Sequence, residues 1–271
     1  MHDAIDLDAY LQRIGMRAAA APDLATLQAI IAAHVAAIPF ENLNPLLALP
    51  VDLALPALER KLVFDGRGGY CFEQNLLLVA ALRAIGFEVS GLIARVVWTR
   101  PDDAVTPQSH MLVRVELAGG SWLVDVGFGV QTPSGALRLQ PDIEQPTPLE
   151  PFRLQHKDGR WRMQSLVHGQ WLSLYHFDLR PVPLIDYVVA NHYVSTHPES
   201  NFVNNLSVAR TLSDRRLSLR NREFTVRRPE SEPERRQLRD ATEIRQVLER
   251  EFGLRLPGTA ALDRRLGELP D

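Results

Sequence analysis

The chain has 271 residues, of which 45% are apolar and 23% charged, and its formal net charge is −3. This length allows one large domain or two to three small domains that share a core, and the weak net charge gives no reason to expect a nucleic acid or an acidic membrane as partner. The single cysteine excludes an internal disulfide and any zinc site built from several cysteines, and we expect no metal cofactor.

The first residues, 1–6 (MHDAID), contain acids and no basic segment, which is not the pattern of a signal peptide. The most apolar stretch, residues 30–40, is too short to cross a membrane and contains His34. A free thiol fits a reducing compartment. We therefore expect a soluble cytoplasmic protein without a membrane partner.

The first third of the chain has the apolar spacing of helices. Helices are predicted at residues 7–14, 24–36, 56–62 and 71–86. Gly15 and Gly86 end the first and the last of these, and Asp23 can cap the second. The last of them begins at Cys71, directly after a pair of glycines.

After Gly86 the apolar period changes from 3.6 to 2, which indicates strands. Strands are predicted at residues 89–98, 110–117, 122–126, 152–154, 161–167 and 171–177. Gly119-Gly120 is typical of a hairpin turn, and two further turns are expected at 158–159 and 168–169. This section therefore predicts a small antiparallel barrel or sheet.

The remainder of the chain is mixed, so the fold class is α+β with three segments, 1–86, 87–182 and 183–271. Beyond the barrel we expect a helix at 184–196, paired strands at 206–212 and 217–226 with a turn near Arg220, and a last helix at 234–252. Residues 229–236 are charged and are interpreted as a solvated linker, and the tail after Pro257 as mobile.

Three residues in this frame suggest nucleophilic acyl transfer. A thiol attacks an acyl carbon as the thiolate, and both the start of a helix and a neighbouring imidazolium favour that form. Cys71 stands at a predicted helix start, and His110 and Asp125 follow in the order base, then orienting carboxylate. N–H groups at the same helix start can serve as an oxyanion hole.

Each of these residues also has a purely structural interpretation. A lone cysteine is commonly a small buried apolar residue, and His110 is one of eight histidines. Asp125 lies in a strand-like run, where a carboxylate without a partner is costly, and the Gly119-Gly120 hairpin can bring it beside His110. From spacing alone, a triad and three unconnected structural residues remain comparable alternatives.

The blocks around these residues resemble the arylamine N-acetyltransferases. The specific ones are Arg-Gly-Gly-Tyr-Cys-Phe-Glu-Gln-Asn (67–75) and Asp-Val-Gly-Phe-Gly (125–129). Further matches, in the family's order, are 38–43, 94–98, 109–112 and, more weakly, 191–198 leading into Phe202. The resemblance implies a helical bundle, an antiparallel β-barrel and a C-terminal α/β lid around a papain-like and transglutaminase-like catalytic core.

The same resemblance implies the chemistry. Acetyl-CoA, the cosubstrate, acetylates Cys71, and an arylamine, hydrazine or N-hydroxyarylamine then takes the acetyl group in a ping-pong reaction. Residues carried over for the acceptor pocket are Phe40, Val96, Phe128 and Phe202, and those for the CoA channel are Trp98, Gly127 and Gly129. Arg67, Glu41 and Asn42 are expected to brace the active-site helix.

Phosphate groups of CoA need cationic or N–H partners. The C-terminal third offers seven arginines, and the sequence does not choose among Arg210, Arg215, Arg216, Arg220, Arg222, Arg227 and Arg228.

Other functions remain open at this point. An amide synthase would release a polyketide chain from a carrier protein with the same triad, and a papain-like or transglutaminase-like hydrolase would use water as acceptor. A non-enzymatic interaction module would leave the three aligned residues unexplained. The physiological acceptor, the acyl chain length and the oligomeric state are not determined by the sequence.

Overall fold

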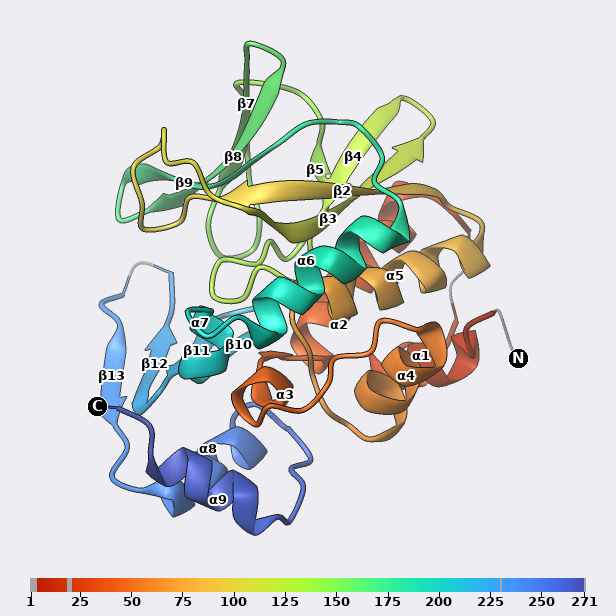
Figure 1. Ribbon diagram of the computed structural model, residues 1–271. Helices are drawn as coiled ribbons and strands as arrows, with labels where there is room; N and C mark the ends of the chain where they lie inside the picture. Colours follow the sequence, from red (N-terminus) through yellow and green to blue (C-terminus); the bar gives the residue numbers. More distant parts are fainter. Residues whose placement is uncertain (1–3, 19–20, 230, 271) are drawn as a thin grey trace.

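The helices of the first third lie beside an antiparallel barrel, and a second sheet with its own helices lies below both (Figure 1). The computed structural model describes residues 4–18, 21–229 and 231–270. The first third contains α1 (Leu7–Arg13), α2 (Leu24–Ala37), β1 (Phe40–Glu41), α3 (Leu43–Leu46), α4 (Leu55–Leu58), the π-helical turn η1 (Glu59–Phe64) and α5 (Cys71–Ile85). This order confirms the predicted helices, with 56–62 realised as α4 continuing into η1.

Local sequence signals explain where these helices begin and end. Asp6 and Asp23 accept hydrogen bonds from the backbone N–H groups three residues on, which caps α1 and α2. Gly86 ends α5 in a left-handed conformation (φ 106°) that favours glycine.

Eight antiparallel strands follow and nearly close into a barrel. They are β2 (Glu88–Val96), β3 (Gln108–Leu117), β4 (Gly120–Val124), β5 (Leu137–Arg138), β6 (Glu144–Gln145), β7 (Phe152–Lys157), β8 (Arg160–Val167) and β9 (Gln170–Phe177), in the order β5-β4-β3-β2-β9-β8-β7-β6. The Gln145 side chain connects the two outer strands, because it bonds both the N–H and the carbonyl of Arg138. The predicted antiparallel barrel is confirmed.

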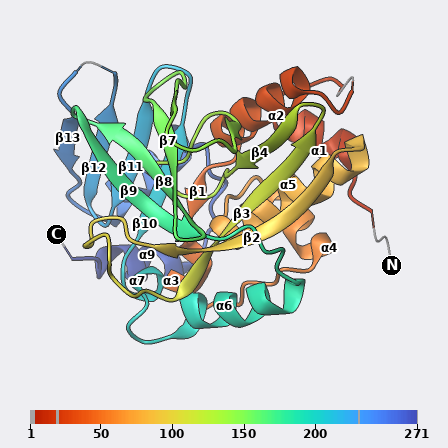
Figure 2. The same cartoon turned by 90° about the horizontal axis from the view of Figure 1, so that it is seen from above.

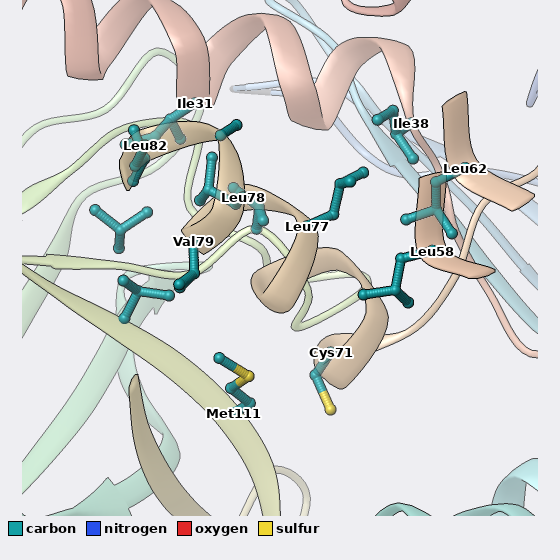
Figure 3. Packing of buried hydrophobic residues seen from close by; sticks show 14 of the residues in the cluster. Ile31, Ile38, Leu58, Leu62, Cys71, Leu77, Leu78, Val79, Leu82 and Met111 are labelled. Carbon is teal, nitrogen blue, oxygen red and sulfur yellow. The ribbon is translucent and has the colours of Figure 1, made fainter. Parts of the chain in front are cut away.

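Strands β2 to β4 bury both faces. Leu112 and Leu123 face the interior of the barrel, whereas Met111, Val113 and Val124 pack against the helical core. Figure 2 shows β2 and β3 running along α5, and Figure 3 shows Met111 beneath the same helix. This two-sided packing fixes the position of β3 relative to the start of α5.

The last third contains α6 (Leu184–Thr196), α7 (Asn201–Asn204), β10 (Ser207–Thr211), β11 (Arg216–Arg220), β12 (Glu223–Arg227), β13 (Glu234–Gln237), α8 (Ala241–Arg250) and α9 (Ala260–Gly267). Its sheet has the order β1-β10-β11-β12-β13, so β1 from the first third forms one edge. The segment boundaries 1–86, 87–182 and 183–271 stay predictions.

Two expectations for this region are wrong. The helix predicted at 234–252 is split, because residues 234–237 pair with β12 as a strand and Asp240 caps a new helix start at α8. This strand also replaces part of the expected linker. The tail after Pro257 contains α9, which buries Leu262 and Leu266 against α8; its mobility stays a prediction.

Across the described residues, no helix has both the length and the apolar character needed to cross a membrane.

Candidate active site

Cys71 is the first residue of α5, and its sulfur turns away from the apolar cluster of Leu58, Leu62 and Leu77 (Figure 3). Two close backbone approaches place it there. A Cβ at Gly68 would lie 2.0 Å from the carbonyl oxygen of Pro39, and one at Gly69 would lie 2.7 Å from the Glu73 carboxylate. Both glycines are therefore required for the chain to turn sharply into α5.

His110 lies between the thiol and a carboxylate. Its Nε2 atom donates to Asp125 Oδ2 at 2.7 Å, which leaves Nδ1 for Cys71. Burial lowers the pKa of His110, but the Asp125 charge and the contact with Cys71 raise it more, to about 10. The structure thus brings together all three predicted residues.

Asp125 is held by two groups to which the sequence analysis gave no such role. Its Oδ1 atom accepts from the Gly127 N–H at 2.9 Å and from the Asn75 amide at 3.3 Å. Asn75 also accepts from the Val126 N–H and donates to the Met111 carbonyl. Its position could have been predicted from the sequence spacing, because Asn75 stands one helical turn after Cys71 on the same face of α5.

Aromatic rings enclose the imidazole. The ring centroids of Phe128 and Tyr175 lie 5.1 and 5.0 Å from that of His110. Burial and the nearby Asp125 charge raise the pKa of Tyr175 well above its usual range. Its hydroxyl has no hydrogen-bond partner of regular geometry among the described residues. Sequence reasoning missed Tyr175, which comes from the distant strand β9.

A cavity of about 910 Å³ opens beside the thiol. It is lined by Cys71 and His110 and by every residue carried over for substrate or CoA: Phe40, Val96, Trp98, Gly127, Phe128, Gly129 and Phe202. Asp125 is not part of the lining and lies behind His110. Phe40 and Phe202 meet edge to face at 5.8 Å between centroids, which gives this part of the cavity an aromatic wall.

Gly129 has a left-handed backbone (φ 83°), and a Cβ there would lie 3.6 Å from the Phe40 ring. The conformation, more than the space, requires glycine at this position.

Buried ion pairs brace the turn before α5. Arg67 donates twice to Glu41 Oε1, at 2.8 and 3.0 Å, and Lys61 lies 2.6 Å from Glu73. Burial raises the pKa of both carboxyls; at Glu41 the two cations outweigh it and lower that pKa, whereas the pKa of Glu73 stays raised. Asn42 bonds instead to the Phe202 and Asn205 carbonyls and ties α7 to β1. Arg67 and Glu41 thus make the contact expected of them at this turn, whereas Asn42 does not join it.

A second buried network reaches the same turn from α1 and α2. His34 Nε2 donates to Gln74 Oε1 at 2.7 Å, and its Nδ1 accepts from the Tyr10 hydroxyl at 2.9 Å. The Gln74 amide group then donates to the Pro39 and Gly69 carbonyls. Burial lowers the pKa of His34 to about 4.

Within residues 4–18, 21–229 and 231–270, no three His, Cys, Asp or Glu side chains group closely enough to hold a metal ion.

Comparison with known proteins gives a consistent result. A family model described as N-acetyltransferase matches residues 23–261. The arylamine N-acetyltransferase of Mycolicibacterium smegmatis is 45% identical over 264 residues, which cover 96% of each chain. The arylamine N-acetyltransferase / N-hydroxyarylamine O-acetyltransferase of Salmonella typhimurium is 39% identical over 249 residues, or 92% of this chain and 88% of that relative.

Among solved structures, that of the Mycobacterium marinum arylamine N-acetyltransferase in complex with CoA matches with a TM-score of 0.94 at 38% identity, over 98% of this chain and 100% of that chain. The expected fold class, α+β around a papain-like core, is confirmed by these matches. The similarity extends over nearly the whole sequence, and the chain therefore belongs to the arylamine N-acetyltransferase family of acyltransferases.

Proposed function

We propose that this protein transfers an acetyl group from acetyl-CoA to the nitrogen of an arylamine, hydrazine or N-hydroxyarylamine through an acetyl-Cys71 intermediate. The observation that carries the proposal is the hydrogen bond of 2.7 Å between His110 and Asp125 at the wall of a cavity that also exposes Cys71. A thiol, a base and a carboxylate in this order are the components of covalent acyl transfer.

In the first half-reaction the Cys71 thiolate attacks the acetyl carbonyl carbon of acetyl-CoA. The bond from that carbon to the CoA sulfur breaks, and the leaving thiolate takes a proton from the His110 imidazolium. The high pKa of His110, about 10, supports this starting state, in which the imidazolium stabilises a neighbouring thiolate. CoA then departs, and the acetyl group stays on sulfur.

In the second half-reaction the acceptor nitrogen attacks the acetyl carbon. The neutral imidazole of His110 takes the proton of that nitrogen, the carbon–sulfur bond breaks, and the Cys71 thiolate and the imidazolium return. Two separate half-reactions predict ping-pong kinetics.

The start of α5 supports the charge that develops on the acetyl oxygen. The first N–H groups of a helix have no acceptor within it, so those of Cys71 and Phe72 can face this oxygen. One such donor is worth about 3 kcal/mol where it has been measured.

The cavity lining supports both substrates. Phe40, Val96, Phe128 and Phe202 form an apolar wall suited to a flat aromatic amine. We assign Trp98, Gly127 and Gly129 to the CoA side, in keeping with the CoA complex described for the Mycobacterium marinum relative.

The direct experiment is intact mass measurement with peptide mapping, after mixing the protein with acetyl-CoA and no amine. We expect one acetyl group on Cys71, discharged on addition of aniline. An unmodified Cys71 would contradict the proposal and point to a carrier-protein amide synthase or a hydrolase.

A further inference from the structure

The structure distinguishes the seven arginines that the sequence left equivalent as partners for the CoA phosphates. Six make contacts away from the cavity that contains Cys71. Arg215, Arg216, Arg227 and Arg228 lie beside carboxylates, and Arg210 and Arg222 donate to backbone carbonyls. Of the seven, Arg220 alone lines the cavity.

Arg220 has no carboxylate partner among the described residues. It ends β11 and is paired across the sheet with Ser207 of β10. Its guanidinium donates to the Ser207 hydroxyl at 2.7 Å and to the Asn201 side-chain oxygen. Both acceptors are neutral, so they orient the planar group without neutralising its charge, and an anion in the cavity can still bind to it.

The surroundings of Arg220 are suited to an anion. The hydroxyl-bearing Ser207 and Ser218 line the same part of the sheet, and Arg100 contributes a second guanidinium from the loop after β2. Among the described residues that line this cavity, Glu199 is the one Asp or Glu. The non-catalytic charges of the cavity wall are thus two cations and one carboxylate.

We propose that Arg220 binds a phosphate group of the CoA acyl donor; this inference rests on the proposed function. The sheet register gives the distance between Phe40 and Arg220. Phe40 pairs with Ala209, and Ala209 pairs with Ser218, which lies two residues before Arg220. Strand spacing and rise then place the Cα atoms of Phe40 and Arg220 about 12 Å apart. This is longer than one aromatic ring, so Arg220 lies beyond the part of the wall that Phe40 forms, in the same cavity as Cys71.

The experiment compares two acetyl donors on the Arg220→Gln variant. Acetyl-CoA contains the phosphates, whereas p-nitrophenyl acetate acetylates a thiol without them. Loss of one charge-assisted contact predicts a KM for acetyl-CoA raised about tenfold, with little change in kcat/KM for the aryl ester. Arg220→Lys, which keeps the charge, should restore part of the loss. Arg235→Gln removes a charge from the exposed strand β13 of the same sheet and is the matched control.

Two results would overturn the inference. One is an unchanged KM for acetyl-CoA in Arg220→Gln. The other is a loss confined to acceptors that contain a carboxylate, such as 4-aminobenzoate, compared with aniline, which would assign Arg220 to the acceptor. If acetyl-CoA fails to acetylate Cys71 in the unaltered protein, the proposed function itself fails, and that result is separate from either.

Discussion

A Cβ atom on Gly127 would lie 2.6 Å from the Cα atom of Cys71. The loop after Asp125 therefore lies directly against the first turn of α5, with no room for a side chain between them. The same residue donates its N–H to Asp125. One glycine thus sets the distance between the helix that holds the thiol and the loop that holds the carboxylate.

Gly127→Ala should lower both activity and stability. The added methyl group meets backbone, so the loop has to move away from α5, and a displacement of about 1 Å can cost about 100-fold in rate. We expect overpacking to cost about 1–3 kcal/mol in the free energy of unfolding, measured by urea denaturation. Gly258→Ala is the control, because a Cβ there meets no atom within 4 Å. Equal activity of the two variants would mean that the close approach is not needed for catalysis.

Cys71→Ala should abolish acetyl transfer while the protein stays folded. The sulfur points away from the core (Figure 3), and its hydrogen bond to the Ser109 carbonyl is a weak one at 3.7 Å. Turnover of aniline with acetyl-CoA and thermal unfolding are the measurements. Substantial residual turnover would rule out Cys71 as the nucleophile.

Asp125→Asn should lower the pKa of His110, because burial then acts without the opposing carboxylate. In the unaltered protein, we expect the ring to stay protonated until the pH approaches about 10. In the variant it should be neutral at pH 7, and the rate of transfer should fall by about 10⁴, as in the serine-protease precedent. Titration of ¹⁵N-labelled histidine by NMR measures the change.

The His110–Asp125 pair also predicts how the stability of the protein changes with pH. A raised histidine pKa stabilises the fold fully below the unfolded value of about 6.5, and this contribution is lost as the pH rises through about 10. Asp125→Asn should therefore destabilise the protein more at pH 6 than at pH 10. Asp158→Asn, in an exposed turn, is the control. A pH-independent difference would contradict a charged His110–Asp125 pair.

The features that could be predicted from the sequence are local ones, and contacts between segments far apart in the chain could not be predicted. The start of α5, the β3–β4 hairpin and the order of Cys71, His110 and Asp125 follow from glycines, caps and apolar period within short windows. The residues carried over from the family resemblance for the acceptor and for CoA also line the cavity. Tyr175 could not be found in this way, and Arg220 could not be chosen among the seven arginines, because strand pairing alone brings β9 and β11 to the site.

The wrong prediction of a helix at residues 234–237 has the same cause. Glu, Arg and Gln favour helices locally, but β12 offers an unpaired edge that turns this segment into a strand. Asp240 is the local signal for the observed helix start, because its side chain caps α8.

His34 should make the protein acid-sensitive. Its ring is buried between Tyr10 and Gln74, and burial lowers its pKa to about 4, below the unfolded value of about 6.5. Between these values the unfolded chain binds a proton that the folded chain does not, so stability falls as the pH drops from 6.5 to 4, by up to about 3 kcal/mol.

Urea denaturation at pH 7.5, 5.5 and 4.5 measures this loss. His34→Gln removes the titrating group and should flatten the pH dependence, although it lowers stability at pH 7.5 by disturbing the bonds to Tyr10 and Gln74. His168→Gln, at a surface turn with a left-handed backbone, should leave the dependence as it is. Because the Gln74 amide also holds the Pro39 and Gly69 carbonyls, His34→Gln should also reduce transfer at pH 7.5. An identical pH slope in His34→Gln and the unaltered protein would assign the acid sensitivity to other groups.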